Sequence, residues 1–317
     1  MQTLQLLTMA MATSTARAPD DPSAEAGLRL RTMATTEAAY AVPDYLAEEC
    51  QRKLRAAASG RLASGDDDRL SAAWREKIVE WAFAAADHFD FDRETAGVAL
   101  SFLDRYLAVR AVDRRSFQLA AMTALYLAAK LAQPSDAKLG LASLVELSRE
   151  AFVADDVVKM EVELLACLGW RVHPPTPAAF LADLLPLAAD LLPPADRFRA
   201  AELALFLTEL TACDYWFVTH AASSVALAAV LHALEVLHEF HAPRRRAAFL
   251  RSVVGAGLAV DAAEGSAAAR CLQRLREVYA AGGYASMFEE AEDARVSTVS
   301  PTDIIDGPEA ESGMECA

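Results

Sequence analysis

The sequence lacks the residue patterns that mark most secreted, metal-binding and membrane-spanning proteins. Its five cysteines stand singly at positions 50, 167, 213, 271 and 316, without a CxxC pair. This excludes the usual zinc spacings and favours a reducing compartment. Glycine and proline number only 13 each, which excludes a collagen-like or low-complexity chain. No stretch reaches the roughly 18 uninterrupted apolar residues of a membrane-spanning helix, so we expect no membrane association.

Motifs for catalysis and cofactor binding are absent as well. The sequence has no glycine-rich phosphate loop and no nucleophile elbow. His238 and His241 lie three residues apart and near His232, but no carboxylate–histidine pattern completes a metal site, which favours surface or interface histidines. The net charge of −15 would repel phosphate backbones. We expect no enzyme activity, no cofactor, no metal and no nucleic-acid partner.

What the sequence does contain is helical periodicity, rich in alanine, with 54% hydrophobic residues. One helix is predicted between Asp113, a typical N-cap, and Pro134; a second is predicted over residues 153–170. Lys130 closes the first helix, and Glu161 interrupts the apolar surface of the second. The second helix is expected to be buried among its neighbours, with one apolar face made by Val158, Val162, Leu165 and Leu168. The two charges are either solvated residues that flank a core or groups offered to a partner.

The two ends of the chain differ from its middle. Residues 1–36 begin with an apolar run that is interrupted by threonines and is not preceded by basic residues. We therefore expect a disordered tail, with a cleaved targeting segment as the alternative. Residues 284–317 are acidic and rich in Ser, Thr and Pro, which predicts a second disordered tail. Ser300, which precedes a proline, is a candidate phosphosite within it.

Between the first tail and the main helical region, residues 37–70 are expected to form a helix and a linker. The helix is predicted over 40–58, with Pro43 in its first turn. Its narrow apolar stripe consists of Tyr45, Leu46, Cys50 and Leu54.

Prolines within residues 173–177 forbid a continuous helix and divide the helical region into two halves. Five helices are expected in the first half, residues 71–173, and five in the second, residues 174–283. Those of the second half are predicted at 177–187, 195–213, 219–238, 244–259 and 264–281. The expected fold is therefore all-α, with two tandem five-helix domains.

Five pieces of the first half together resemble the N-terminal box of a cyclin, the regulatory subunit of cyclin-dependent kinases. They follow that family's order and spacing: WREKIVEW (74–81), ALSFLDRYLA (99–108), FQLAAMTALYLAAK (117–130), KMEVELLACLGWRV (159–172) and TPAAFLADLL (176–185). Residues 201–234 are similar to the second, less conserved cyclin box. The resemblance implies two tandem cyclin boxes and an N-terminal helix that lies across the first.

The resemblance also implies a role for the two charged residues. In cyclins, the lysine that ends the third box helix and the glutamate of the fifth bind backbone groups of the kinase near its mobile helix C. Here these residues are Lys130 and Glu161, and Leu127 and Leu131 would add apolar contact area. The family usually continues after this lysine with Phe and two Glu, whereas this chain has LAQ at 131–133.

Trp74, Ile78 and Trp81 recur at helical spacing, which indicates either a core stripe or, by the resemblance, a docking groove. In cyclins the matching positions, joined by a glutamine that is here Gln118, bind RxL-type peptides of substrates and inhibitors. Trp74 replaces a smaller methionine that is common in the family.

Arg75 and Asp104 match an internal ion pair of the family. Asp104 lies between apolar residues, where an unpaired carboxylate would cost free energy. We therefore predict a structural pair.

The resemblance predicts a regulatory subunit that binds and activates a cyclin-dependent protein kinase in cell-cycle control, in the nucleus and cytoplasm. The sequence at residues 168–172 and 175–180 is nearer to D-type, growth-phase cyclins than to mitotic ones, although the LxCxE motif is missing. The alternative is a cyclin-fold adaptor that binds a partner without activating a kinase, which the LAQ segment motivates.

Overall fold

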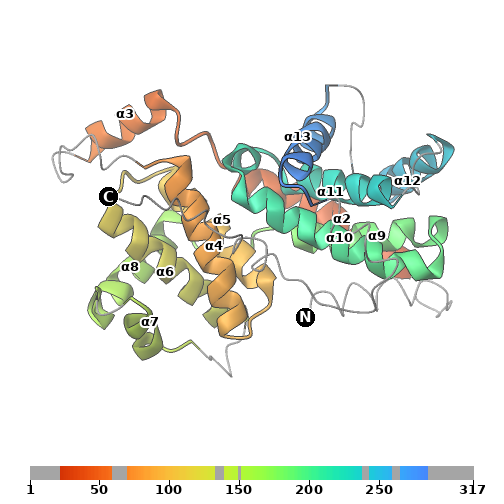
Figure 1. Cartoon of the computed structure of the whole chain (residues 1–317). Helices are drawn as coiled ribbons and strands as arrows, with labels where there is room; N and C mark the ends of the chain where they lie inside the picture. The colour runs from red at the N-terminus through yellow and green to blue at the C-terminus, as the bar shows by residue number, and fades with distance from the viewer. Residues whose placement is uncertain are drawn as a thin grey trace, which may run out of the picture.

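Two helical bundles lie side by side in the computed structural model, which describes residues 22–58, 70–132, 139–148, 151–237, 243–258 and 265–284 (Figure 1). The first bundle consists of α4 (Ala72–His88), α5 (Arg93–Leu107), α6 (Arg114–Ala132), α7 (Leu141–Leu147) and α8 (Ala154–Cys167). The second consists of α9 (Pro177–Ala188), α10 (Pro194–Cys213), α11 (Ala222–Val236), α12 (Pro243–Gly255) and α13 (Ala267–Ala281), with the 3₁₀ turns η3 (Ala189–Leu191) and η4 (Tyr215–Thr219). Before both bundles come α2 (Pro22–Glu37), η1 (Ala38–Tyr40) and α3 (Glu48–Ala57). The predicted all-α, two-bundle architecture is confirmed.

Polar residues begin several of these helices, as the sequence predicts for Asp113. The Asp92 side chain accepts a hydrogen bond from the Glu94 amide at 2.9 Å, and Asp113 accepts one from the Ser116 amide at 2.7 Å. Thr176 likewise accepts from the Ala179 amide at 3.0 Å. Each bond satisfies one of the amides that the first turn of a helix leaves without an intrahelical acceptor.

Each bundle is organised around one central helix. In the first bundle α6 packs against both α5 and α8, and it buries Phe117, Ala121, Leu125 and further residues along its length. In the second, α11 packs against α9, α10 and α13 and is buried nearly all round from Val225 to Leu234. The apolar surfaces of both cores exclude water, which supplies most of the driving force for folding.

The expected disordered tail over residues 1–36 is wrong for its last part, because residues 22–37 form α2. This helix packs along α9 of the second bundle, and Ala26 and Leu30 are buried there (Figure 1). Gly27 allows a close approach, since a Cβ at this position would lie 3.2 Å from the Ala256 carbonyl oxygen. The packing surface that stabilises α2 comes from helices more than 140 residues further along the chain, which a local pattern does not reveal.

An ion pair joins α2 to the second bundle, and its loss should release the helix. Arg29 donates from Nη2 to Oδ1 of the buried Asp183 at 2.6 Å. Arg29→Met leaves this carboxylate buried without the guanidinium, so we expect a loss of about 1–3 kcal/mol. Hydrogen exchange of the α2 amides should become faster, whereas Lys53→Met, on the exposed face of α3, should leave it unchanged. Unaltered exchange in α2 would contradict a role for the pair.

The helix predicted over residues 40–58 begins only at Glu48. Tyr45 is fully buried in the core of the first bundle, while Leu46 and Cys50 pack against that core partly buried. Pro43 therefore lies in an extended segment and not in a first helical turn. The helix that lies along the second bundle is α2.

Other predictions fall on residues beyond those described. Residues 1–21 and 285–317, which include Ser300, lie outside the described ranges, as do His238 and His241. Among the helices that are described, none is long and apolar enough to cross a membrane.

Candidate functional site

Lys130 and Glu161, 31 residues apart in sequence, meet on the outside of the first bundle. Lys130 lies in the last turn of α6, and its Nζ is 2.6 Å from Oε1 of Glu161 on α8. The lysine side chain is 50% exposed and the glutamate side chain 15%. The resemblance implies that both residues contact the same part of a kinase, and the structure brings them together.

The surroundings of Lys130 favour its charged form. The hydrogen bond to Glu161 raises the pKa of the Lys130 ammonium above its ordinary value, against a smaller lowering by burial. The Tyr126 ring lies 5.3 Å from the ammonium, and the C-terminal end of α6 carries a partial negative charge that also attracts a cation. The half-exposed ammonium is thus a preformed donor, with N–H groups left beyond the one that Glu161 accepts.

Exposed apolar side chains flank this pair. Val158 and Val162 lie within one turn of Glu161 on α8 and are 46% and 65% exposed. Leu131, directly after Lys130, is 37% exposed, and Trp170 beyond the end of α8 is 73% exposed. Exposed apolar side chains that gather beside polar groups mark protein-binding surfaces.

Leu127 does not belong to this surface, because it is only 3% exposed and packs in the core of the first bundle. The expectation that α8 is buried among its neighbours is also wrong, because Val158 and Val162 of its predicted apolar face are exposed. α8 buries the stripe of Val157, Met160 and Leu164, which is followed by Leu168, a buried residue that also belongs to the predicted face. The sequence of α8 carries apolar residues on both stripes, so the exposed one remains available for contact.

The residues of the predicted docking groove lie on α4 and α6. Trp74, Ile78 and Trp81 are partly buried and pack against the cores of the first bundle. The Trp74 ring lies 5.9 Å from that of Phe117, and Gln118 is exposed on α6. The three residues share one face of α4, which agrees with both the core-stripe and the groove interpretation.

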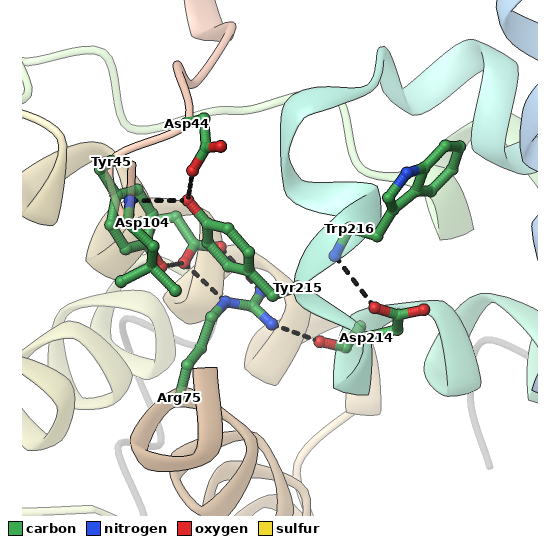
Figure 2. A network of polar contacts seen from close by, with 9 residues as sticks. Asp44, Tyr45, Arg75, Asp104, Asp214, Tyr215 and Trp216 are labelled. Carbon is green, nitrogen blue, oxygen red and sulfur yellow. Dashed lines mark hydrogen bonds and ion pairs between the residues drawn. The ribbon is translucent and has the colours of Figure 1, made fainter. Parts of the chain in front are cut away.

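Arg75 and Asp104 form the predicted ion pair in the interior (Figure 2). Arg75 donates from Nε to Oδ1 at 2.8 Å and from Nη2 to Oδ2 at 2.9 Å, and both side chains are almost fully buried. Tyr45 donates from its hydroxyl to Oδ1 of Asp104 at 2.7 Å. Burial alone would lower the pKa of Arg75, but the Asp104 carboxylate outweighs it and raises this pKa.

The same network connects the two bundles. Arg75 also donates from Nη1 to the carbonyl oxygen of Ala212 at 2.6 Å, near the end of α10, where carbonyls lack intrahelical donors. The Tyr215 hydroxyl accepts from the Leu46 amide at 3.1 Å and donates to Asp44 at 2.8 Å. The N-terminal segment, the first bundle and the second bundle therefore meet at one buried cation.

Sequence reasoning missed the tyrosines of this network and the exposed valines of α8. Tyr45 and Tyr215 approach edge to face, with ring centroids 5.1 Å apart, although 170 residues separate them. The one available signal was Asp104, because a buried carboxylate usually needs more hydrogen-bond donors than one guanidinium supplies.

Comparison with known proteins gives a consistent result for the first bundle. Residues 43–173 match the family model "Cyclin, N-terminal domain". Cyclin-B2-2 of Arabidopsis thaliana is 32% identical over 171 residues, 54% of this chain and 38% of that protein. Cyclin-D3-3 of the same plant is 34% identical over 122 residues, 38% of this chain and 34% of that protein. The chain thus spans little more than a third of these relatives.

B-type and D-type relatives match with similar identity, so the nearer likeness to D-type cyclins stays a prediction. Among solved structures, a viral cyclin from herpesvirus saimiri has a similar fold, with a TM-score of 0.53 at 14% identity. The match covers 67% of this chain and 86% of that one, so it extends over both bundles.

Proposed function

We propose that this chain, whose residues 43–173 match the N-terminal domain of cyclins, is the regulatory subunit of a cyclin-dependent protein kinase. The observation that carries the proposal is the exposed Lys130–Glu161 pair, at the positions where cyclins contact their kinase. The role proposed is activation of that kinase in cell-cycle control, in the nucleus and cytoplasm.

The proposed binding surface combines the charged pair with the apolar residues beside it. The Lys130 ammonium would donate to carbonyl groups of the kinase main chain, and Glu161 would accept from its amides. Val158, Val162 and Leu131 would cover apolar parts of the kinase around these bonds. Because both helices are anchored in the core, the surface is rigid before binding and loses little conformational entropy on association.

Activation follows from a shift in population. The kinase alone samples a state in which helix C is swung out and its glutamate is separated from the catalytic lysine. A subunit that packs against helix C stabilises the inward state, in which the Lys–Glu pair needed for phosphoryl transfer can form. The chain described here thus contributes contacts and no catalytic group.

A second candidate function is an adaptor that binds a partner without activating a kinase. The observation that favours it is the LAQ sequence at 131–133, which lacks the aromatic residue and the two carboxylates usual in cyclins. With fewer contacts to the kinase, binding would supply less free energy to stabilise the inward position of helix C.

We also propose that Trp74, Ile78 and Trp81, with Gln118, dock RxL-type peptides of substrates or inhibitors. The partial burial of the three α4 residues and the exposure of Gln118 support this. The large Trp74 side chain would favour peptides that are small at the facing position.

Co-expression with a panel of cyclin-dependent kinases tests the function. We expect the chain to co-elute with at least one kinase and to raise its phosphorylation of histone H1 by at least tenfold over the kinase alone. Co-elution without a rise in activity would favour the adaptor. If the chain binds no kinase of the panel, the proposal is wrong.

A further inference from the structure

A cavity of about 500 Å³ lies between the two bundles and takes no part in the proposed kinase contact. Residues of α5 line it from the first bundle and residues of α10 from the second. Residues 34–42 and 175–178 close further sides, so all three parts of the described chain contribute. Its volume falls within the range of about 300–1,000 Å³ that is typical of small-molecule sites, which often lie where domains meet.

Gly97 keeps part of this cavity open. It lies within α5, where glycine destabilises a helix by about 0.5–1 kcal/mol relative to alanine. A Cβ at this position would meet no atom within 4 Å, so close packing against a neighbour does not explain the glycine. Leu100, one turn further along α5, and Leu205 of α10 give the cavity apolar walls.

Negative charge exceeds positive charge in the lining. Its carboxylates are Glu37, Glu94, Asp104 and Glu209, and its guanidinium groups are Arg75 and Arg93. Arg75 pairs with Asp104 and Arg93 with Glu209, which leaves two carboxylates. In the described part of the chain, neither Glu37 nor Glu94 forms an ion pair.

These two carboxylates differ in how well hydrogen-bond donors stabilise their negative charge. Glu37 accepts from both the amide and the hydroxyl of Ser223, in the positive first turn of α11. Glu94 accepts from the Thr176 hydroxyl through Oε1 alone at 2.8 Å. Although Glu94 lies in the first turn of α5, burial raises its pKa. A cation beside Glu94 would therefore be stabilised more than one beside Glu37.

We propose that this cavity binds a small organic cation with an apolar body, whose ammonium or guanidinium group pairs with Glu94. The apolar body lies between Leu100 and Leu205, in the space beside Gly97. Since every wall comes from a different part of the chain, a bound cation would also hold the two bundles together. The proposal rests on the cavity and not on kinase binding.

Three matched probes test the chemistry: 4-phenylbutylamine, 4-phenylbutan-1-ol and 4-phenylbutanoate, titrated into the full chain by calorimetry at pH 7. We expect the amine to bind about tenfold or more tightly than the alcohol, because a hydrogen bond to a charged group adds that much. The carboxylate should bind more weakly than either. Equal affinity of the three probes, or no measurable binding of the amine, would overturn the proposal.

Variants of two lining residues locate the site. Glu94→Gln should reduce the affinity for the amine to that for the alcohol. Gly97→Leu should reduce the affinity for the amine at least tenfold, because the leucine fills the space. The control Gly97→Ala should retain binding and raise Tm. Unchanged amine affinity in Glu94→Gln overturns the proposal even if Gly97→Leu fails to fold. Kinase activation is measured separately, so either proposal can fail while the other stands.

Discussion

Lys130→Ala and Glu161→Ala should each weaken kinase binding by about 10–100-fold, with a matching loss of histone phosphorylation at limiting concentrations of the chain. The reason is that each substitution removes a charge-assisted hydrogen bond to the kinase main chain, worth about 1.5–3 kcal/mol. Dissociation constants from calorimetry, with the kinase that co-elutes, measure the effect directly.

The stability of the free chain should hardly change in these variants. Because Lys130 is half exposed, its pair with Glu161 contributes at most about 1 kcal/mol to folding. For kinase binding, the double variant should lose less free energy than the sum of the two single losses, since both residues share one network.

Lys53 and Glu49 on α3 provide a matched control. They form an ion pair of similar length, 2.7 Å, with both side chains more than 70% exposed, on a helix that is not part of the proposed surface. Lys53→Ala and Glu49→Ala should bind and activate as the wild type does. If Lys130→Ala behaves like Lys53→Ala, the Lys130–Glu161 pair is only a solvated ion pair and the kinase-binding role is wrong.

Asp104→Ala should reduce the free energy of unfolding by about 3–5 kcal/mol, because it leaves a buried guanidinium without its counter-ion. Arg75 would retain only the carbonyl oxygen of Ala212 among the acceptors seen here, and Tyr45 would lose the acceptor of its hydroxyl. Denaturation monitored by circular dichroism measures the loss. Hydrogen exchange should increase on both sides of the junction, in α4 and near the end of α10.

Two further variants distinguish a buried network from a generic effect of charge removal. Arg110→Ala breaks an ion pair with Glu163 whose side chains are 50% and 44% exposed, and it should cost about 1 kcal/mol or less. Arg75→Met combined with Asp104→Leu should recover part of the loss, since apolar residues can replace a buried pair at little cost. A loss below about 1 kcal/mol for Asp104→Ala would contradict the central position of this pair.

The helices and their order could be predicted from the sequence because their signals are local. Cap residues such as Asp92 and Thr176 and the prolines at 173–177 mark boundaries within a few residues. Lys130 and Glu161 could be identified from the sequence as well, because the match of five ordered segments to one family aligns both residues with that family's kinase-binding positions. Local hydrogen bonds and side-chain spacing need no knowledge of distant parts of the chain.

Whether an apolar stripe faces the core or the solvent could not be predicted from such local signals. α8 has two such stripes, and the packing of α5 and α6 buries Met160 while it leaves Val162 in solvent. α9 and its neighbours cover Leu30 of α2, and Asp104 accepts a hydrogen bond from the Tyr45 hydroxyl in the segment before α3. In each case the free energy that selects the conformation comes from surfaces of other helices that the fold brings together. Helix identity and order are thus properties of short segments, whereas burial, exposure and the junction between the bundles depend on long-range packing.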